Sequence, residues 1–380
     1  MRIYLLLSIA GLLLCGPLFA RSENCDGTPE YRASVEDGYR KLQYRTSIYG
    51  HLPPDGAGIR LGIYQVQADC GPGATAKNLV RMEEAVKLAK KFGVQLLAFP
   101  ELFLPGYTLS PESARKAAEY KDGPSIRRGR EVARQSNMAI ILPYAEKVKT
   151  PDGSLQYYDS IAVINEKGEL LDSYRKTQLY GQQERDNWSF GESDYPVHSI
   201  YGFPVGVLNC YECEFPELSR VLALKGAKLI VGPTAADNYY TLPGGERSKV
   251  PYPDVSKILF PANAYANNIF FAYANRCGYE RRGDDEWHYR GNSIVYGPDG
   301  GVIVEASHQQ NTMLIVDCLP AYYGMTHPAP KYYYLKDRRP DQYRELIAPT
   351  VNFLNIGATD INLKTDFLKG GYTYPSASGK

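Results

Sequence analysis

The sequence predicts a mixed α/β domain built in layers, and three observations support this prediction. In the first half of the chain, short apolar runs rich in β-branched residues alternate with amphipathic helical stretches. In the second half, strand-like runs follow one another with tight turns between them. The chain has 380 residues, of which 44% are hydrophobic and 22% charged, so it can bury a sizeable core. This order of elements is typical of sheets covered by helices.

The elements of the first half follow from their apolar patterns. Residues 59–68 are the first expected strand and residues 95–99 the second. The helix between them spans residues 76–91, with Thr75 as the expected N-cap. Its apolar side chains fall on one face, opposite lysine and glutamate: Leu79, Met82, Val86 and Ala89. Residues 125–136 are expected to form a second helix.

The remaining strands are predicted from short apolar runs bounded by turn residues. Turns are expected at residues 151–153 and 166–169. A helical pattern opens at Glu214, with Pro216 near its first turn. The expected strands are residues 139–144, 158–165, 170–175, 204–209, 228–231, 269–274, 293–296, 302–305 and 313–316.

The chain divides into four predicted parts. Residues 1–20 combine a basic start, an apolar stretch too short to span a bilayer comfortably and a small residue at the end, which is typical of a cleaved signal peptide. An uncleaved anchor is the alternative. Residues 21–57 are expected to form an N-terminal arm, residues 58–330 the main domain and residues 331–380 a C-terminal extension with a loose tail. We therefore expect a periplasmic or secreted protein without a membrane-spanning helix after cleavage.

Charge and composition exclude several classes of protein. Loss of Arg2 with the signal peptide reduces 43 basic residues to 42, equal to the 42 acidic ones, which argues against a nucleic-acid binder. The five histidines are far apart and form no ligand-spaced cluster, so we expect no metal site. Export implies oxidising surroundings, and a disulfide between Cys25 and Cys70 is our expectation, although spacing alone leaves other pairings open.

Cys210 is the strongest candidate for a catalytic residue. It follows the buried strand 204–209 and precedes the helical pattern at Glu214. A thiol at a strand-to-helix corner is exposed at the edge of the sheet, and a helix N-terminus favours its nucleophilic thiolate form. Cys210 and Cys213 also have the spacing of a thioredoxin-like redox pair, which is an alternative interpretation.

Two further residues have the character of partners for this thiol. Glu101 follows the apolar strand 95–99, where desolvation raises a carboxyl pKa toward the range that suits a general base. Lys176 closes the short strand 170–175, and a buried ammonium there could stabilise a developing oxyanion.

Three segments with these residues resemble the nitrilase superfamily, the carbon–nitrogen hydrolases with a Glu-Lys-Cys triad. The order and wide spacing of the segments match, and the resemblance extends over residues 59–318, most closely to the amidase branch and its bacterial stereoselective amidases. It implies a four-layer αββα sandwich, assembly into dimers or larger homo-oligomers, and no cofactor. The matching segments are Phe99-Pro100-Glu101, Tyr174-Arg175-Lys176, Cys210–Glu217, Gly232–Ala235, Ala272–Glu280, Tyr289–Ser293 and Gly297–Gly300.

The resemblance also implies roles for individual residues. Glu101 would be the base, Lys176 the oxyanion stabiliser and Cys210 the nucleophile that forms a thioester. Glu146 matches a second glutamate that supports Lys176 and orients substrate, and Glu184 matches an acid after the lysine loop. The residues expected to bind substrate are Tyr107, Tyr211 (through its backbone N–H), Thr234, Asp237 and Asn238.

The expected partner is a small-molecule amide or nitrile. A nitrile would use the same three groups through a thioimidate, so nitrilase is the first alternative function. Tyr211 stands where many nitrilases carry tryptophan, which favours an amide. A binding protein on the same scaffold is a further alternative.

Overall fold

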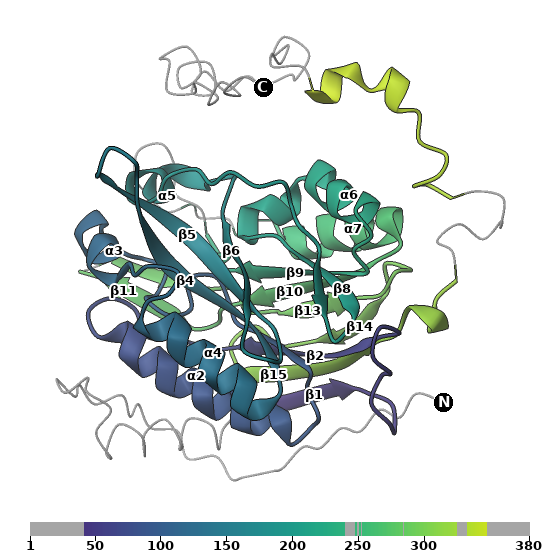
Figure 1. Cartoon of the computed structure of the whole chain (residues 1–380), viewed down its shortest axis with the longest axis horizontal. Helices are drawn as coiled ribbons and strands as arrows, with labels where there is room; N and C mark the ends of the chain where they lie inside the picture. Colours follow the sequence, from purple (N-terminus) through teal and green to yellow (C-terminus); the bar gives the residue numbers. More distant parts are fainter. Residues whose placement is uncertain are drawn as a thin grey trace. The chain divides into compact units, whose positions relative to one another are not determined.

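The structure is a computed structural model that describes residues 42–239, 248, 251, 253–283, 285–324 and 333–347 (Figure 1). The chain forms two compact units, Met1–Tyr334 and Leu335–Lys380. The described part of the second unit contains the short 3₁₀ helices η4 (Pro340–Gln342) and η5 (Arg344–Ile347). The predicted signal peptide, Cys25 and most of the predicted arm lie outside the described residues.

The first unit contains a seven-stranded sheet with the order β1-β15-β2-β3-β4-β5-β6. Neighbours β2, β3 and β4 run parallel and are joined through helices, whereas β4, β5 and β6 run antiparallel and are joined by the two predicted turns. The strands are β1 (Gln43–Ser47), β2 (Ile59–Gln65), β3 (Leu96–Ala98), β4 (Ala139–Lys149), β5 (Leu155–Ile164), β6 (Leu170–Arg175) and β15 (Thr312–Cys318).

A six-stranded sheet has the order β14-β13-β10-β9-β8-β7. Its central strands β8, β9 and β10 are parallel. The strands are β7 (His198–Ile200), β8 (Phe203–Val207), β9 (Leu229–Thr234), β10 (Phe270–Asn275), β13 (Ile294–Tyr296) and β14 (Val302–Glu305). A separate antiparallel ribbon pairs β11 (Tyr279–Arg282) with β12 (Asp285–His288).

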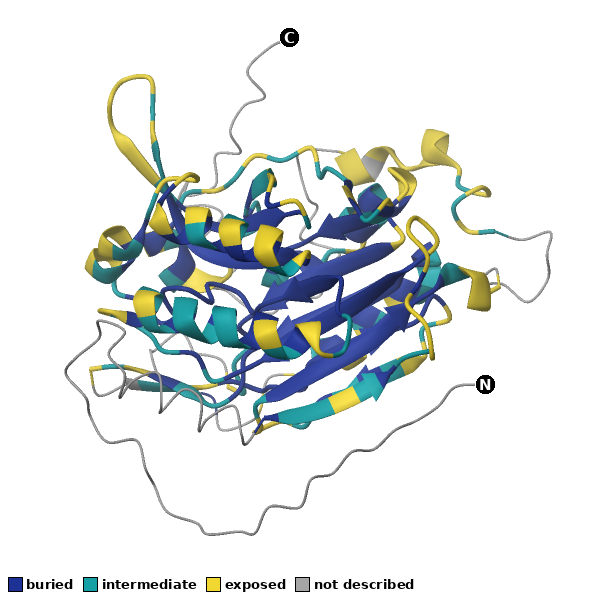
Figure 2. Ribbon diagram, turned by 60° about the horizontal axis from the view of Figure 1, so that its bottom comes forward, coloured by how far each residue is buried: buried dark blue, intermediate teal, exposed yellow. Residues whose placement is uncertain are grey.

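The two sheets pack face to face and helices cover their outer faces (Figures 1 and 2). Leu61 of β2 and Val205 of β8 belong to the apolar cluster between the sheets. Tyr64, on the other face of β2, packs with Met82 of α2 (Ala74–Lys90) in the cluster that also includes α4 (Pro124–Ser136). The helices α6 (Pro216–Leu224) and α7 (Leu259–Asn267) lie over the second sheet. This arrangement confirms the predicted four-layer αββα sandwich.

Close helix–sheet packing depends on glycine at one point of the first sheet's outer face. A Cβ on Gly129 of α4 would lie 2.9 Å from Leu142 Cδ2, closer than real Cβ contacts. The predicted helix 125–136 therefore approaches the sheet with its backbone, and its burial includes Ile126 and Ala133. Each fully buried Ile or Leu side chain in such a layer contributes roughly 1.5–3 kcal/mol to folding.

Several local features differ from the sequence prediction. The helix α2 begins at Ala74 after Gly73, whose φ of 77° is left-handed, so Thr75 lies inside the first turn and is not the N-cap. Residues 43–47 form β1 at the sheet edge, where they pair with β15. This strand was not predicted because its sequence is mostly polar. Other unpredicted elements are β7, β11, β12, α7, α3 (Pro111–Ala117) and α5 (Gly181–Asn187).

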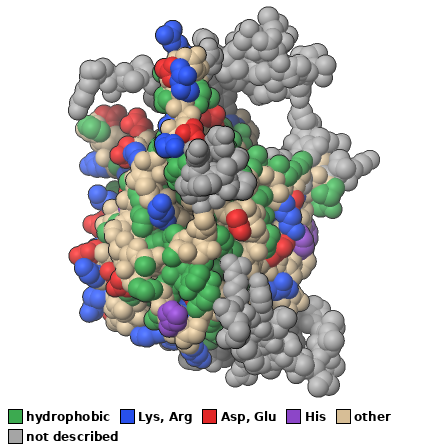
Figure 3. Space-filling model, turned by 90° about the vertical axis from the view of Figure 1, so that its right-hand side faces the viewer, with side chains coloured by type: hydrophobic (Ala, Val, Ile, Leu, Met, Phe, Trp, Pro, Cys, Tyr) green, Lys and Arg blue, Asp and Glu red, His purple; other side chains and the backbone are tan. Residues whose placement is uncertain are grey.

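The surface of the described residues fits the balanced composition. On the face drawn in Figure 3, basic and acidic side chains are interspersed among polar and hydrophobic ones. Across the ranges that the structure describes, none of the helices combines the length and apolar character needed to cross a bilayer.

Candidate active site

Three loops bring the predicted catalytic residues to one end of the sandwich. Glu101 lies just after β3, Lys176 directly after β6, and Cys210 three residues after the end of β8. Buried strands therefore fix the start of each loop. Lys176 contacts Glu101, and both interact electrostatically with Cys210, although the three residues are up to about a hundred positions apart in sequence.

Lys176 lies between two buried carboxylates. Its Nζ donates to Glu101 Oε1 at 2.5 Å and to Glu184 Oε1 of α5 at 2.8 Å, and its side chain has no exposed surface. Burial alone lowers the pKa of Lys176, but the charges of Glu101 and Glu184 outweigh it and raise that pKa well above its usual value. Lys176 is therefore a permanent cation inside the site.

The Glu101 loop is held by a buried arginine. Arg276 follows β10, and its guanidinium donates to the backbone carbonyls of Glu101 (2.6 and 3.1 Å) and Leu102 (2.6 Å). Leu102 has a φ of 43°, an uncommon value for a leucine, so the chain turns sharply here. Arg276 also pairs with the buried Glu280. The base candidate is thus positioned through backbone contacts from a distant strand.

Cys210 begins the 3₁₀ turn η1 (Cys210–Glu214) with a φ of 53°. This strained corner is typical of functional residues on strand-to-helix turns. Burial raises the pKa of the Cys210 thiol well above its usual value, with Glu101 adding to the rise and Lys176 opposing it. The resting sulfur is therefore a protonated thiol that needs a base to become a nucleophile.

Glu212 connects the cysteine loop to the lysine loop. Its carboxylate accepts from the backbone N–H of Asn209 at 2.7 Å and from Thr177 N–H and Oγ1 at 2.6 Å each. Tyr174 Oη donates to it at 2.7 Å. Four donors satisfy this buried carboxylate, so the two loops keep a fixed separation. Sequence analysis named the segment but did not predict this role.

The sequence profile of the carbon–nitrogen hydrolase family matches residues 60–327, which is most of the chain. The chain belongs to this family. A protein described as a hydrolase in the pqqF 5'region of Pseudomonas protegens is 35% identical over 290 residues, 76% of this chain and 92% of the relative. An (R)-stereoselective amidase from a Pseudomonas species is 31% identical over 288 residues, 72% and 94% of the two chains.

A solved structure gives the same assignment for this carbon–nitrogen hydrolase. A mutant of the amidase from Nesterenkonia sp. AN1 is 31% identical, covers 78% of this chain and 99% of its own, and has a TM-score of 0.58. In that structure the acetamide moiety of fluoroacetamide is covalently attached to the active-site cysteine. The resemblance inferred from the sequence is confirmed: the chain is an amidohydrolase of the nitrilase superfamily, related to amidases.

The predicted support of Lys176 by Glu146 is corrected by the structure. Glu146 is buried on β4, where it accepts two bonds from Arg175, at 2.8 and 2.9 Å, and one from Ser160 at 2.9 Å. Successive residues of a strand face opposite sides, so Arg175 and Lys176 point to different faces of the sheet. Glu146 follows Arg175 to the helix-covered face, and Glu184 makes the contact with Lys176 instead.

Tyr107 is the predicted substrate-binding residue with the clearest link to the site. Its Oη donates to Glu184 Oε1 at 2.6 Å, and its backbone N–H donates to Glu280 at 3.0 Å. Tyr211, next to the nucleophile, packs its ring edge-to-face against Tyr180, with the ring centres 5.3 Å apart. These two tyrosines place aromatic surface beside Lys176 and Cys210.

The other predicted substrate-binding residues lie at the end of β9 (Thr234) and just after it (Asp237 and Asn238). Thr234 is buried and its hydroxyl donates to the carbonyl of Gly232 at 3.0 Å, so its polar atom serves the strand. Asp237 forms an isolated bridge with Tyr289, and the Asn238 N–H donates to His288 at 2.9 Å. Their contact with substrate stays a prediction. Most of the segment 237–253 lies outside the described residues.

Cys210 and Cys213 are both free thiols in the structure. Cys213 is fully buried, its thiol donates to the Leu208 carbonyl at 3.7 Å, and burial raises its pKa well above the usual value. Cys70 is partly buried, and burial raises its pKa to about 12. Its predicted partner Cys25 lies outside the described residues, so that disulfide stays a prediction.

Proposed function

We propose that this carbon–nitrogen hydrolase cleaves small amides through a thioester on Cys210. The observation that supports this most is the buried Lys176 ammonium, held between two carboxylates beside a thiol with a raised pKa. Burying these charges costs free energy even though they are paired. A redox or purely binding protein has no use for such an arrangement.

The proposed reaction begins with transfer of the Cys210 proton to Glu101. The sulfur attacks the amide carbonyl, and the Lys176 ammonium and the Tyr211 N–H stabilise the tetrahedral oxyanion. Glu101 returns the proton to the leaving amine or ammonia, which departs as the C–N bond breaks. Water that Glu101 deprotonates then attacks the thioester, and the carboxylic acid and the free thiol are released.

The proposed substrate is a short aliphatic amide. A mutant of the related Nesterenkonia amidase carries the acetamide moiety of fluoroacetamide on its active-site cysteine, and another mutant was solved in complex with butyramide. In this chain Tyr107 and Tyr211 flank the reacting groups, so bulky aromatic walls border the space for the acyl group. A nitrile is the second candidate, because the same three groups suffice for it; Tyr211 favours the amide.

The test compares purified protein with Cys210→Ala on matched panels of amides and nitriles, with ammonia release and product mass as readouts. We expect amide turnover by the natural chain and a loss on the order of 10³-fold or more in the variant. Turnover of nitriles alone would replace the amide proposal, and near-natural turnover by the variant would refute the nucleophile.

We also propose that the protein is exported and loses residues 1–20. Support comes from the charge and hydropathy pattern of that segment. N-terminal sequencing of protein recovered from cell fractions tests it. A chain that starts at Arg21 in the exported fraction supports cleavage, and an intact Met1 start inside the cell contradicts it.

A further inference from the structure

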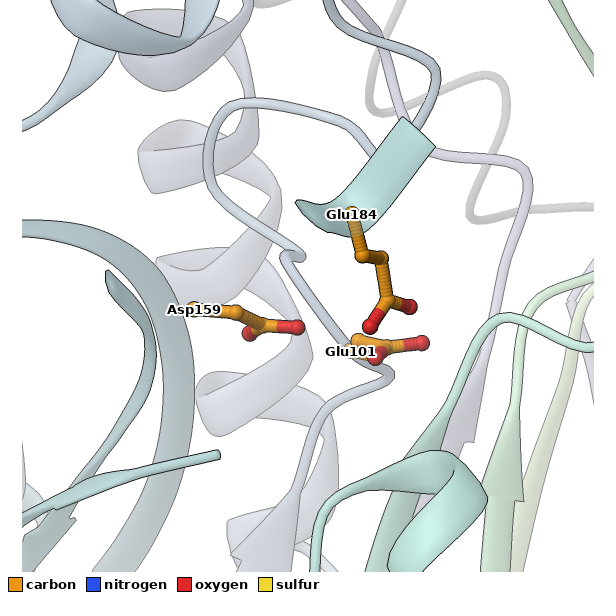
Figure 4. Close-up of side chains that lie close together, drawn as sticks. All are labelled: Glu101, Asp159 and Glu184. Carbon is orange, nitrogen blue, oxygen red and sulfur yellow. The ribbon is translucent and has the colours of Figure 1, made fainter. Parts of the chain in front are cut away.

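Three buried carboxyl groups surround one buried lysine at the centre of the site. Figure 4 shows the carboxylates of Glu101, Asp159 of β5 and Glu184 converging, with one oxygen of each within 4.8 Å of the other two. Lys176 Nζ lies 2.5 Å from Glu101, 2.8 Å from Glu184 and 3.8 Å from Asp159. All four side chains are buried. If every group were charged, the cluster would hold a net charge of −2 without water, which is strongly unfavourable.

Hydrogen-bond donors identify the acid that is least stabilised as an anion. Glu184 accepts from Lys176 at 2.8 Å, Tyr107 Oη at 2.6 Å and the Tyr180 N–H at 2.7 Å. Among the residues that the structure describes, Asp159 accepts one side-chain bond, from the neutral amide of Asn209 at 2.9 Å. Bonds from charged or multiple donors favour the ionised form, so Asp159 is the poorest anion of the three.

Two oxygens in this cluster lack a partner. Asp159 Oδ2 and Glu101 Oε2 are both buried without a hydrogen bond. Buried polar atoms are rarely left unpaired, because each costs the free energy of losing water. The Asp159 and Glu101 carboxyl groups are close enough to share a hydrogen bond, so a proton on Asp159 Oδ2 would supply a donor for Glu101 Oε2 and satisfy both atoms at once.

We propose that Asp159 is protonated in the resting enzyme and donates a hydrogen bond to the carboxylate of Glu101, the proposed base. Asp159 is then a positioning residue that acts through Glu101. The inference rests on the proposed function, since it assigns the proton of the same site. The charged groups that face Asp159 are Glu101, Lys176 and Glu184.

The electrostatics of the site agree with this assignment. Burial is the largest influence on Asp159, and the Glu101 charge is the next; together they raise the pKa of Asp159 well above its usual range, against the opposing effect of Lys176. A neutral carboxylic acid at position 159 donates a hydrogen bond, and the amide of asparagine at the same position can also donate one. Asp159→Asn therefore tests the proposal.

The test measures the acid limb of the pH profile of kcat/KM for Asp159→Asn and Asp159→Ala. The amide of Asp159→Asn copies the neutral acid, so we expect its kcat within about 3-fold of the natural enzyme and an unmoved acid limb. In Asp159→Ala the Glu101 anion loses a donor. We expect kcat to fall about 10–100-fold with little change in KM, and the acid limb to rise by about half to one pH unit.

The opposite charge state gives a different result. If Asp159 were ionised, the neutral amide of Asp159→Asn would remove a negative neighbour of Glu101, and the acid limb would move to lower pH. That shift, or an Asp159→Ala variant with an unchanged limb and kcat, would overturn the proposal. Should Asp159→Ala not fold, the direction of the shift in Asp159→Asn decides alone.

Two controls separate this inference from other effects. Asp317→Asn neutralises a buried carboxylate that pairs with Arg60 at 2.7 Å, at the opposite end of β2, and should lower stability without moving the limb. Alkylation of Cys210 by iodoacetamide, followed by intact mass against pH, reports the same limb without turnover. If the natural enzyme cleaves no amide, the proposed function fails, whereas the alkylation profile still supports or overturns the state of Asp159.

Discussion

Replacement of Lys176 by methionine should damage both stability and activity, because it leaves two buried carboxylates without their cation. The ammonium lies 2.5 Å from Glu101 and 2.8 Å from Glu184, and all three side chains are at most 1% exposed. At an effective dielectric constant of about 20, each contact amounts to roughly 6 kcal/mol of gross attraction. Desolvation offsets much of this, and removal of one partner from a buried pair costs about 3–5 kcal/mol net.

The cost in Lys176→Met should depend on pH. Burial raises the pKa of Glu184 above its value in the unfolded chain, and Lys176 opposes this rise. Without the lysine, the pKa of Glu184 in the folded protein rises further. A carboxyl group with a raised folded pKa stabilises the fold below its unfolded pKa, and this contribution is lost as pH rises through the folded pKa. We therefore expect a larger loss of stability at pH 8 than at pH 5.5, together with a loss of kcat of about 10²–10³-fold.

Urea denaturation at these two pH values measures the effect, with Lys116→Met as the matched control. Lys116 makes an equally short ion pair with Glu112, at 2.6 Å, but the two side chains are 75% and 77% exposed. Such surface pairs contribute little, so the control should unfold like the natural protein. A Lys176→Met variant that loses less than about 1 kcal/mol, or the same amount at both pH values, would contradict the buried-pair reasoning.

Three other variants test the arrangement of the site. Glu146→Gln should keep kcat within about 3-fold, because Glu146 lies on the other face of the sheet, but should lower stability by about 1–3 kcal/mol through the loss of its charged bonds to Arg175; a large fall in kcat at natural stability would restore its predicted catalytic role. Arg276→Lys puts one nitrogen in place of the three that bond the Glu101 and Leu102 carbonyls and Glu280, so kcat should fall by about 10-fold or more in steady-state assays, and unchanged kinetics would count against positioning by Arg276. Cys213→Ser should retain hydrolysis, with unchanged sensitivity to peroxide; a loss of peroxide sensitivity would revive a regulatory disulfide with Cys210.

The sequence was informative where a catalytic residue directly follows a buried strand. The runs before Glu101 and Cys210 are apolar and short, so both strands could be predicted to within two residues of their ends. The layers were predicted from the family resemblance. The local sequence pattern could not predict them, because pairing such as that of β1 with β15 joins segments far apart in the chain.

Residues that act through tertiary contacts were harder to predict. Glu146 lies on β4 and Glu184 on α5, and only the tertiary structure decides which of these two acids reaches Lys176. Glu212 and Asp159 sit beside residues that were correctly placed, yet nothing in their local pattern indicates that their carboxylates are buried. Such roles become visible only when donors from several loops are seen around one oxygen.

The bonds from Arg276 and Glu212 to the backbones of other loops also bear on how this enzyme matures after synthesis. These tethers join stretches that are synthesised at different times, so the reactive centre cannot assemble until nearly the whole of the first unit has been translated and docked. A nascent or misfolded chain would carry its nucleophile without an activating base, and recovery of hydrolysis during refolding should lag behind the recovery of secondary structure.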